Sequence, residues 1–199
     1  MIELRNLSKD QPYRAFVELY EDALMKNQPS VEAVVISSFN NKTNEVDARF
    51  VNLKYIIDDR WIFFSNYSSP KSKSFESHNQ ISAIFYWNKI NTQIRIKAKI
   101  SKTTADFSDE HFNNRSEEKN ALAISSFQSE TIENFEMVKE RYQSVIKNKE
   151  ILLSRPSYWG GYSFIPYYFE FWEGGEFRLN KRNVYEKKRA GWDHFILQP

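Results

Sequence analysis

The sequence predicts a mostly β protein, an antiparallel β-barrel with α-helices at its periphery. Short segments rich in Val, Ile, Phe and Tyr follow one another with turn residues between them. The strand–helix–strand alternation that builds parallel sheets is not seen. The 199 residues are 41% hydrophobic and 16% aromatic, which is enough for one packed core. We therefore expect a single domain over residues 1–199.

The first predicted element is a helix from Pro12 to Lys26. Its apolar residues recur at helical spacing, and its proline lies near the start, where a helix tolerates it. Strand patterns then occupy 31–39, 48–57, 61–65, 81–87 and 93–100. We expect the second and third of these to form a hairpin across Asp58-Asp59. In the last one, apolar and charged residues alternate, so one of its faces is expected to be in water.

Helices are expected again in the middle of the chain, at about 108–114, 117–127 and 131–147. The remaining strand patterns lie at 164–172, 178–187 and 192–197. Because successive strands are joined by short turns, an antiparallel barrel is favoured over other β architectures.

Composition narrows the function. The formal net charge of +2 is too small to indicate binding to nucleic acid. The absence of cysteine excludes disulfides and thiolate metal sites. No apolar run reaches the length of a membrane span, and no secretory leader is visible. The three histidines show no metal-binding spacing, so we expect no metal. A cytoplasmic protein without nucleic-acid or membrane partners is expected.

The glycines are concentrated near the C-terminus. Four of the five lie in Trp159-Gly-Gly-Tyr162 and in the segment Phe169-Glu-Phe-Trp-Glu-Gly-Gly-Glu-Phe-Arg-Leu-Asn-Lys-Arg182. Such glycines indicate tight turns or close approach of another group. The arrangement resembles the C-terminal signature of the pyridoxamine 5′-phosphate oxidase family. The resemblance implies an FMN-binding split β-barrel, a dimerisation and cofactor motif at about 158–199, and a homodimer with FMN in clefts between subunits.

Upstream, the segment Arg49-Phe-Val-Asn-Leu-Lys54 resembles the family's R-x-V-x-L-K strand. The resemblance implies that this strand contacts FMN through Arg49, Phe50, Val51, Asn52, Leu53 and Lys54. On an ideal strand Arg49 and Lys54 would face opposite ways, because their separation is odd. A strand with two solvated cations is the alternative interpretation.

The segment Phe63-Phe-Ser-Asn-Tyr-Ser-Ser-Pro-Lys71 resembles a second family motif, with Phe64, Ser65 and Lys71 as cofactor contacts. A helix is expected to begin at Ser68-Ser69-Pro70, and the N–H groups at its start favour a phosphate. An ordinary serine cap is the alternative. The sequence departs from the family at Pro70, where a second phosphate-binding arginine is usual.

Further cofactor residues follow from the same resemblance. Gln93 matches a strand glutamine of the family whose amide can hydrogen-bond to the polar edge of the flavin ring. The Gln128-Ser129 pair matches a Gln-Ser pair that helps to hold FMN. Trp172 and Arg182 match residues that line the cofactor. An isolated tryptophan is more often a core residue.

The resemblance is weaker on the substrate side. His111, Arg115 and Lys119 occupy the positions where the family binds the substrate phosphate through Tyr, Arg and Ser. Spacing of four would align them on one face of a continuous helix, although a break is expected near Asn113-Asn114. A solvated polar helix face is the alternative. Arg178 and Asn180 match an Arg and a His over the substrate, and Lys54 is also implied as a substrate contact.

The resemblance implies an FMN-dependent oxidase that converts pyridoxine or pyridoxamine 5′-phosphate to pyridoxal 5′-phosphate. Oxygen is the acceptor and hydrogen peroxide the product, and Lys54 and Arg178 are the implied catalytic residues. Two alternatives remain open. One is a flavoenzyme of the same fold with another substrate, as in phenazine biosynthesis. The other is a non-catalytic protein that binds flavin or pyridoxal phosphate.

Overall fold

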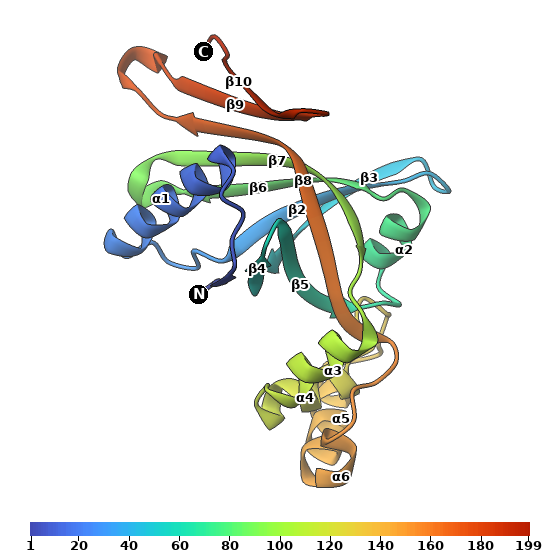
Figure 1. Cartoon of the computed structure of the whole chain (residues 1–199). Coiled ribbons are helices and arrows are strands. Elements are labelled where there is room, and N and C mark those ends of the chain that lie inside the picture. Colours follow the sequence, from blue (N-terminus) through green and yellow to red (C-terminus); the bar gives the residue numbers. More distant parts are fainter.

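The computed structural model describes residues 1–199, and ten strands dominate it (Figure 1). The strands are β1 (Glu3–Arg5), β2 (Ala33–Asn40), β3 (Glu45–Asn52), β4 (Tyr55–Ile57), β5 (Arg60–Asn66), β6 (Gln80–Trp87), β7 (Thr92–Lys102), β8 (Trp159–Glu173), β9 (Lys181–Lys188) and β10 (Gly191–Ile196). The helices are α1 (Gln11–Met25), α2 (Pro70–Ser77), α3 (Ala105–Asn113), α4 (Glu117–Ser125), α5 (Glu136–Lys147) and α6 (Lys149–Leu152), with 3₁₀ turns η1 (Asn88–Ile90) and η2 (Glu176–Arg178).

All ten strands belong to one sheet. Its main order is β1-β4-β5-β8-β7-β6-β2-β3, and β9 and β10 continue from the far end of β8. The sheet curls without closing, and the helices lie around it, with α3 to α6 grouped at one end (Figure 1). The predicted mostly β fold, a split barrel with peripheral helices, is confirmed. One pair departs from the antiparallel pattern, because β1, which the sequence did not predict, pairs with β4 in parallel.

Aromatic side chains fill the core between α1 and the sheet. Phe16 of α1 is completely buried, and its ring lies 4.5 Å from Trp61 and 5.6 Å from Trp87. The apolar face predicted for this helix is thus the face that packs on the sheet. Truncation of such a buried ring to alanine typically removes about 3–5 kcal/mol of stability. The packing of α1 on the sheet is therefore a large contribution to the stability of the fold.

The strand predicted over 48–57 is wrong, because the chain leaves the ladder after Asn52. There Leu53 donates its N–H to Glu32 and Lys54 donates its N–H to Ile62. The Leu53 side chain is completely buried in the core. The strand resumes as β4 at Tyr55 in a new pairing, so the odd spacing between Arg49 and Lys54 does not decide where they face.

Two further predicted boundaries change. The strand expected over 178–187 begins only at Lys181, because η2 and a tight turn occupy the residues before it. In that turn a side chain on Gly175 would come 2.4 Å from the Leu179 carbonyl oxygen, so only glycine fits. The helix expected over 131–147 begins at Glu136. None of the helices combines the length and the hydropathy that a membrane span needs.

Strand β8 connects the two ends of the molecule. Its first residues pair with β5, its last residues pair with β9, and all of it from Tyr162 onward pairs with β7. Between Trp159 and Trp172 the chain advances roughly 40 Å at about 3.3 Å per residue. The start and the end of this strand therefore cannot contact the same small ligand within one chain.

Candidate functional site

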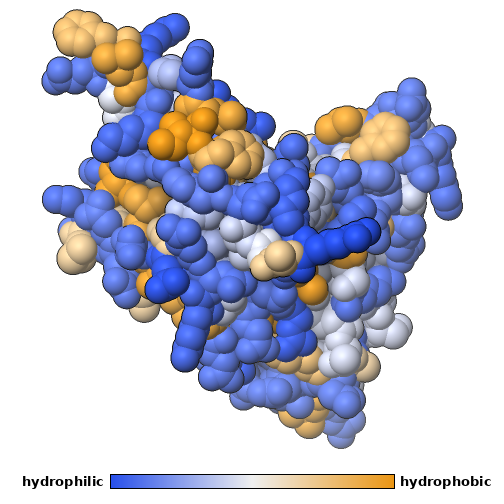
Figure 2. Space-filling model, turned by 45° about the horizontal axis from the view of Figure 1, so that its top comes forward, coloured by the Kyte–Doolittle hydropathy of each residue, from blue (hydrophilic) through white to orange (hydrophobic).

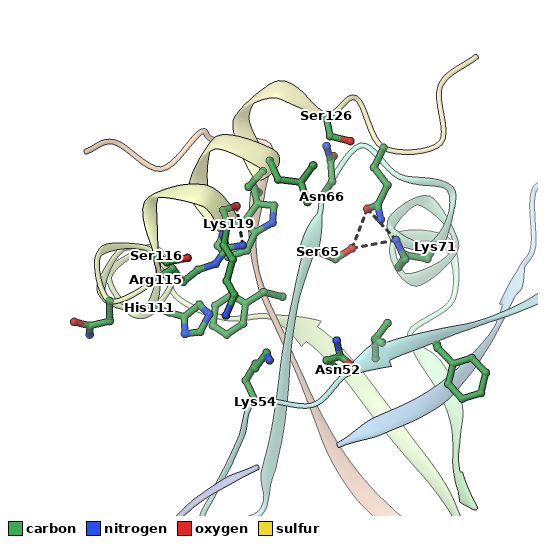
Figure 3. Close-up of a pocket in the computed structure, with 18 residues that line it drawn as sticks. Asn52, Lys54, Ser65, Asn66, Lys71, His111, Arg115, Ser116, Lys119 and Ser126 are labelled. Carbon is green, nitrogen blue, oxygen red and sulfur yellow. Dashed lines mark hydrogen bonds between the residues drawn. The ribbon is translucent and has the colours of Figure 1, made fainter. Parts of the chain in front are cut away.

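A cavity of about 600 Å³ lies where the sheet meets the helical end of the molecule (Figure 3). It is enclosed by the ends of β3 and β5, the start of α2, the α3–α4 region and the start of β8. Its lining residues are Phe50, Val51, Asn52, Lys54, Phe64, Ser65, Asn66, Lys71, His111, Asn114, Arg115, Ser116, Lys119, Leu122, Ala123, Ser126, Gln128 and Trp159.

The lining is strongly basic. Four of its side chains are cations, from Lys54, Lys71, Arg115 and Lys119, and none is a carboxylate. Cations gathered in a concave site without acidic partners repel one another, and an anionic ligand relieves that repulsion. Figure 3 shows Lys71 on one side of the cavity and the other three on the opposite side. The cavity therefore offers two separate positions for negative charge.

Lys71 forms the first position. It is 8% exposed, and its Nζ donates to Ser65 Oγ at 3.1 Å, Ser69 Oγ at 3.2 Å and Gln128 Oε1 at 3.1 Å. Burial, followed by the charge of Arg49, lowers the pKa of Lys71 to about 8. All of its partners are neutral, so the ammonium has no counter-ion within hydrogen-bonding distance. The helix that carries it begins at Pro70, as predicted.

Arg49 lies beside this position without lining the cavity. Its guanidinium donates to the Ile36 carbonyl oxygen at 3.1 Å and to Ser38 Oγ at 2.9 Å, and it pairs with Asp47. The guanidinium is therefore already hydrogen-bonded to groups of the sheet. Its positive charge lowers the pKa of Lys71 without a direct contact. Lys73, two residues beyond Lys71 on α2, is exposed and outside the cavity, so it does not supply the cation missing at Pro70.

Arg115 forms the centre of the second position. Its guanidinium carbon lies 4.3 Å from the centre of the Trp159 ring, and one nitrogen donates to the Lys119 carbonyl oxygen at 3.0 Å. Its other terminal nitrogen, Nη1, is buried without a hydrogen-bond partner. Burial lowers the pKa of Arg115 to about 10. A buried guanidinium nitrogen with no partner is costly unless a ligand oxygen satisfies it.

His111 completes this position. Its ring stacks on Phe64 with centroids 3.6 Å apart, and its Nδ1 lies 2.7 Å from the Tyr55 hydroxyl. Burial lowers the pKa of His111 to about 4, and the charges of Arg115, Lys54 and Lys119 act in the same direction. The imidazole is therefore neutral at physiological pH.

The three residues of the predicted phosphate site do meet, but not on one helical face. Helix α3 ends at Asn113 and α4 begins at Glu117, so His111, Arg115 and Lys119 lie on two helices and the turn between them. The chain folds back at that turn, and all three side chains line the cavity. The three side chains converge because the chain reverses between α3 and α4, and not because a spacing of four aligns them on one helix.

Other predicted residues lie elsewhere. Gln93, Trp172 and Arg182 form one row across β7, β8 and β9, because Gln93 pairs with Trp172 and Trp172 pairs with Arg182. This row belongs to the end of β8 that is remote from the cavity. Ser129 follows the lining residue Gln128 but does not itself line the cavity, while Arg178 is exposed in the turn before β9. Asn180, at the end of that turn, accepts a hydrogen bond from the Gly175 N–H at 3.2 Å.

A buried carboxylate anchors the remote row. Glu170 is 2% exposed and lies 2.8 Å from Arg182 and 3.0 Å from Arg95. The Tyr168 hydroxyl also donates to it at 3.0 Å. Two guanidinium groups and a phenol thus satisfy one buried charge. This network fixes Arg182 at the surface of the sheet.

Several cavity residues were missed by sequence reasoning. Trp159 opens the glycine-rich motif, but the motif alone does not indicate that its side chain lines a cavity. Asn66 and Ser126 are polar residues at the ends of elements, where spacing alone does not distinguish them from ordinary caps. Tyr55, which contacts His111 from behind the lining, follows Lys54 directly and carried no signal of its own.

Comparison with known proteins identifies relatives of the chain. Residues 159–199 match the family model described as the pyridoxine 5′-phosphate oxidase C-terminal dimerisation region. The chain is 33% identical to the pyridoxine/pyridoxamine 5′-phosphate oxidase of Bdellovibrio bacteriovorus over 98% of this chain and 99% of that protein. It is 30% identical to the enzyme of that name from Leptospira interrogans, over 100% of this chain and 92% of that protein.

Solved structures show the same fold. PhzG from Burkholderia lata, in complex with tetrahydrophenazine-1-carboxylic acid, superposes with a TM-score of 0.89 at 22% identity, over 96% of this chain and 93% of that one. A pyridoxamine 5′-phosphate oxidase-related, FMN-binding protein from Nostoc punctiforme gives 0.77 at 10% identity, over 96% and 99%. On the full-length matches at 30% identity and above, the chain belongs to the pyridoxine/pyridoxamine 5′-phosphate oxidase family.

Proposed function

We propose that the protein is an FMN-dependent oxidase that converts pyridoxine or pyridoxamine 5′-phosphate to pyridoxal 5′-phosphate. The observation that carries this proposal is the cavity with two separate cationic positions and no carboxylate. A flavin phosphate and a substrate phosphate are two anions that such a cavity can hold at once. The whole chain acts as one FMN-binding domain, with residues 159–199 in its dimerisation and cofactor part.

The Lys71 position has the donor set that the FMN phosphate requires. A buried ammonium without a counter-ion lies beside the hydroxyl groups of Ser65 and Ser69 and the amide of Gln128. Charge-assisted hydrogen bonds to a phosphate are strong because the lysine is already desolvated. Phe50, Val51 and Asn52 provide a wall next to it, toward which the flavin ring can extend.

The second position is proposed to hold the substrate phosphate. The unpartnered Nη1 of Arg115, the Lys119 ammonium and the His111 ring supply donors there. Lys54 lies between this position and Asn52, so it is placed to contact both substrate and cofactor (Figure 3). Anchoring the phosphate orients the carbon that reacts. The energy of phosphate binding then contributes to a higher kcat.

The redox chemistry belongs to the cofactor, which when bound accepts a hydride from the substrate and passes two electrons to oxygen. For the alcohol, the loss of two electrons and two protons gives the aldehyde, and the same electrons and protons reduce O₂ to H₂O₂. For the amine, water completes the conversion and releases ammonia. The chain's own residues bind and orient the substrate and neutralise the charge of its phosphate. None of them needs to form a covalent bond to the substrate.

The length of β8 supports a homodimer as part of this proposal. The row Gln93, Trp172 and Arg182 cannot reach the cavity of its own chain, because roughly 40 Å of strand separates its tryptophan from Trp159. A second copy can bring this row, together with Arg178, to the cavity of the first. Large apolar side chains are exposed at the surface, including Phe50 at 73% and Phe177 at 91%. Figure 2 shows such side chains in several groups on either side of a notch, as an extensive subunit interface requires.

The experiment is a visible spectrum of the purified protein followed by a peroxide assay. We expect a yellow protein that releases H₂O₂ with pyridoxine 5′-phosphate or pyridoxamine 5′-phosphate and forms pyridoxal 5′-phosphate. Unphosphorylated pyridoxine is the control, and it should react much more slowly because the Arg115 position stays empty. A protein that remains colourless with added FMN would refute the proposal.

One observation favours a second candidate, an oxidase of the same fold with a different substrate. The substrate side carries His111 and Asn180, whereas the cofactor side keeps most of the residues expected of the family. Asparagine can hydrogen-bond but does not titrate near neutrality. A protein that binds FMN but produces no peroxide with either vitamer would favour this candidate.

A further inference from the structure

Tyr55 and His111 form a contact that the proposed function does not use. Tyr55 begins β4, directly after the cavity residue Lys54, and its hydroxyl oxygen lies 2.7 Å from His111 Nδ1 (Figure 3 shows the position of the histidine). The His111 ring is also held face to face against Phe64, with planes 11° apart. The imidazole is thus fixed in both position and rotation.

This fixed ring leaves one nitrogen for a ligand. Nδ1 is occupied by Tyr55, and Nε2 has no hydrogen-bond partner within the protein although His111 lines the cavity. A neutral imidazole carries its proton on one nitrogen only, so the proton on the Tyr55–His111 contact decides whether Nε2 donates or accepts.

Both Tyr55 and His111 are neutral at physiological pH. Burial raises the pKa of the Tyr55 phenol, so the hydroxyl keeps its proton at neutral pH. Burial and the cations Lys54, Arg115 and Lys119 lower the pKa of His111 to about 4. Among the charged groups around Tyr55, Glu3 and Glu110 raise the pKa of the phenol further and Arg5 lowers it. The Tyr55 hydroxyl can therefore donate a hydrogen bond to Nδ1.

We propose that Tyr55 is a positioning residue that holds His111 in the tautomer with the proton on Nε2 when an anion occupies the cavity. In this state Tyr55 O–H donates to Nδ1, and Nε2–H donates to an oxygen of a phosphate dianion. The inference rests on the proposed function in that it assigns His111 to the second anion position. It deepens that proposal by making His111 a neutral donor, in contrast to the charged Arg115 and Lys119.

A neutral donor suits this position physically. A fourth positive charge beside Arg115, Lys119 and Lys54 would add repulsion in a site with no carboxylate, whereas an N–H dipole adds attraction to the anion without that penalty. The bound anion in turn favours the tautomer whose N–H points toward it. Tyr55 can follow, because a hydroxyl serves as donor or acceptor.

The test is nitrogen NMR of the imidazoles in ¹⁵N-labelled full-length protein, saturated with FMN and titrated with inorganic phosphate at pH 7.5. The chain has three histidines, so the variant His111→Phe assigns the signals of His111 by their loss. We expect a pyrrole-type Nε2 and a pyridine-type Nδ1 once phosphate is bound. In Tyr55→Phe, which keeps the ring and removes the hydroxyl, we expect a mixture of tautomers.

Affinity provides the second measurement. His111→Phe retains the stack on Phe64 and removes the donor, so phosphate should bind about threefold to tenfold more weakly. His111→Tyr, which restores an O–H donor on a stacking ring, should recover most of this loss. FMN affinity should be unchanged in all three variants, because Lys71 lies on the other side of the cavity.

The outcomes separate the two proposals. If phosphate binds to wild-type protein but His111 is cationic or carries its proton on Nδ1, the Tyr55–His111 inference is overturned while the anion position stands. A Tyr55→Phe spectrum identical to that of the wild type would also overturn it. If phosphate does not bind and does not compete with pyridoxine 5′-phosphate, the second anion position itself is wrong, and the inference falls with it.

Discussion

Replacement of Lys71 by methionine should stabilise the free protein and weaken its cofactor binding. Burial lowers the pKa of Lys71 from 10.5 to about 8. At about 1.36 kcal/mol per pKa unit, keeping the buried side chain charged at neutral pH lowers the free energy of unfolding by about 3 kcal/mol. Methionine has a similar length and no charge, so most of this penalty should disappear. Loss of the bonds to Ser65 and Gln128 offsets part of the gain, and we expect a net stabilisation of about 1–2 kcal/mol.

The same change should have the opposite effect on FMN. Removal of a charge-assisted contact to the phosphate should weaken binding by about 1.5–3 kcal/mol, which is roughly tenfold to 150-fold. Urea unfolding without FMN and fluorescence titration with FMN, at pH 7 and equal protein concentration, measure the two effects. Lys73→Met is the matched control, since Lys73 is exposed on the same helix, and it should change neither quantity appreciably.

The pH dependence provides an internal check. Folded Lys71 loses its proton at lower pH than the unfolded chain does, so its penalty is full below pH 8 and disappears above about 10.5. The stability difference between wild type and Lys71→Met should therefore shrink as the pH rises through this window. If Lys71→Met destabilises the free protein at pH 7 and leaves FMN affinity unchanged, Lys71 is a structural residue and the reasoning is refuted.

Three further predictions concern the other groups. Arg115→Ala should raise KM for pyridoxine 5′-phosphate and lower kcat while the bound-FMN spectrum stays the same; unchanged steady-state kinetics would remove Arg115 from the substrate site. Glu170→Gln removes the carboxylate that accepts from Arg95 and Arg182 and should lower the unfolding free energy by about 1.5–3 kcal/mol in urea, whereas Glu173→Gln should have little effect. Asn180→His should keep or raise peroxide production with pyridoxine 5′-phosphate, and a loss of that activity would indicate an enzyme adapted to another substrate.

Much of the fold could be predicted from periodicity. The alternation in β7 and the helical spacing of α1 are local patterns, and both appear in the structure at nearly the expected residues. The break at Leu53-Lys54 could not be predicted, because it depends on backbone hydrogen bonds to Glu32 and Ile62, which lie in other segments of the chain. Strand β1 could not be predicted either, because its three residues are too few to show an alternating pattern. It is a strand only because it pairs with β4.

The candidate site could be predicted in part. Lys71, Arg115 and Lys54 follow from motif positions, and all three line one cavity. The sequence did not reveal that the remote row with Trp172 lies at the far end of β8, because motif matching carries no information about distance. A motif also does not show which residue forms a hydrogen bond to another. The contact of Tyr55 with His111 is seen only in the folded structure.

The central claim is that one flavin site combines the Lys71 cavity of one copy with the Trp172–Arg182 row of another. Differently tagged Lys71→Ala and Arg182→Ala chains, co-expressed and purified as the mixed species, test it directly. The shared-site arrangement predicts one intact and one doubly defective site, so the heterodimer should bind one FMN per dimer with wild-type affinity and recover peroxide production. Each homodimeric variant alone should bind weakly. A heterodimer in which both sites bind as weakly as the variants would contradict the claim, because it would place both residues in a site within one chain.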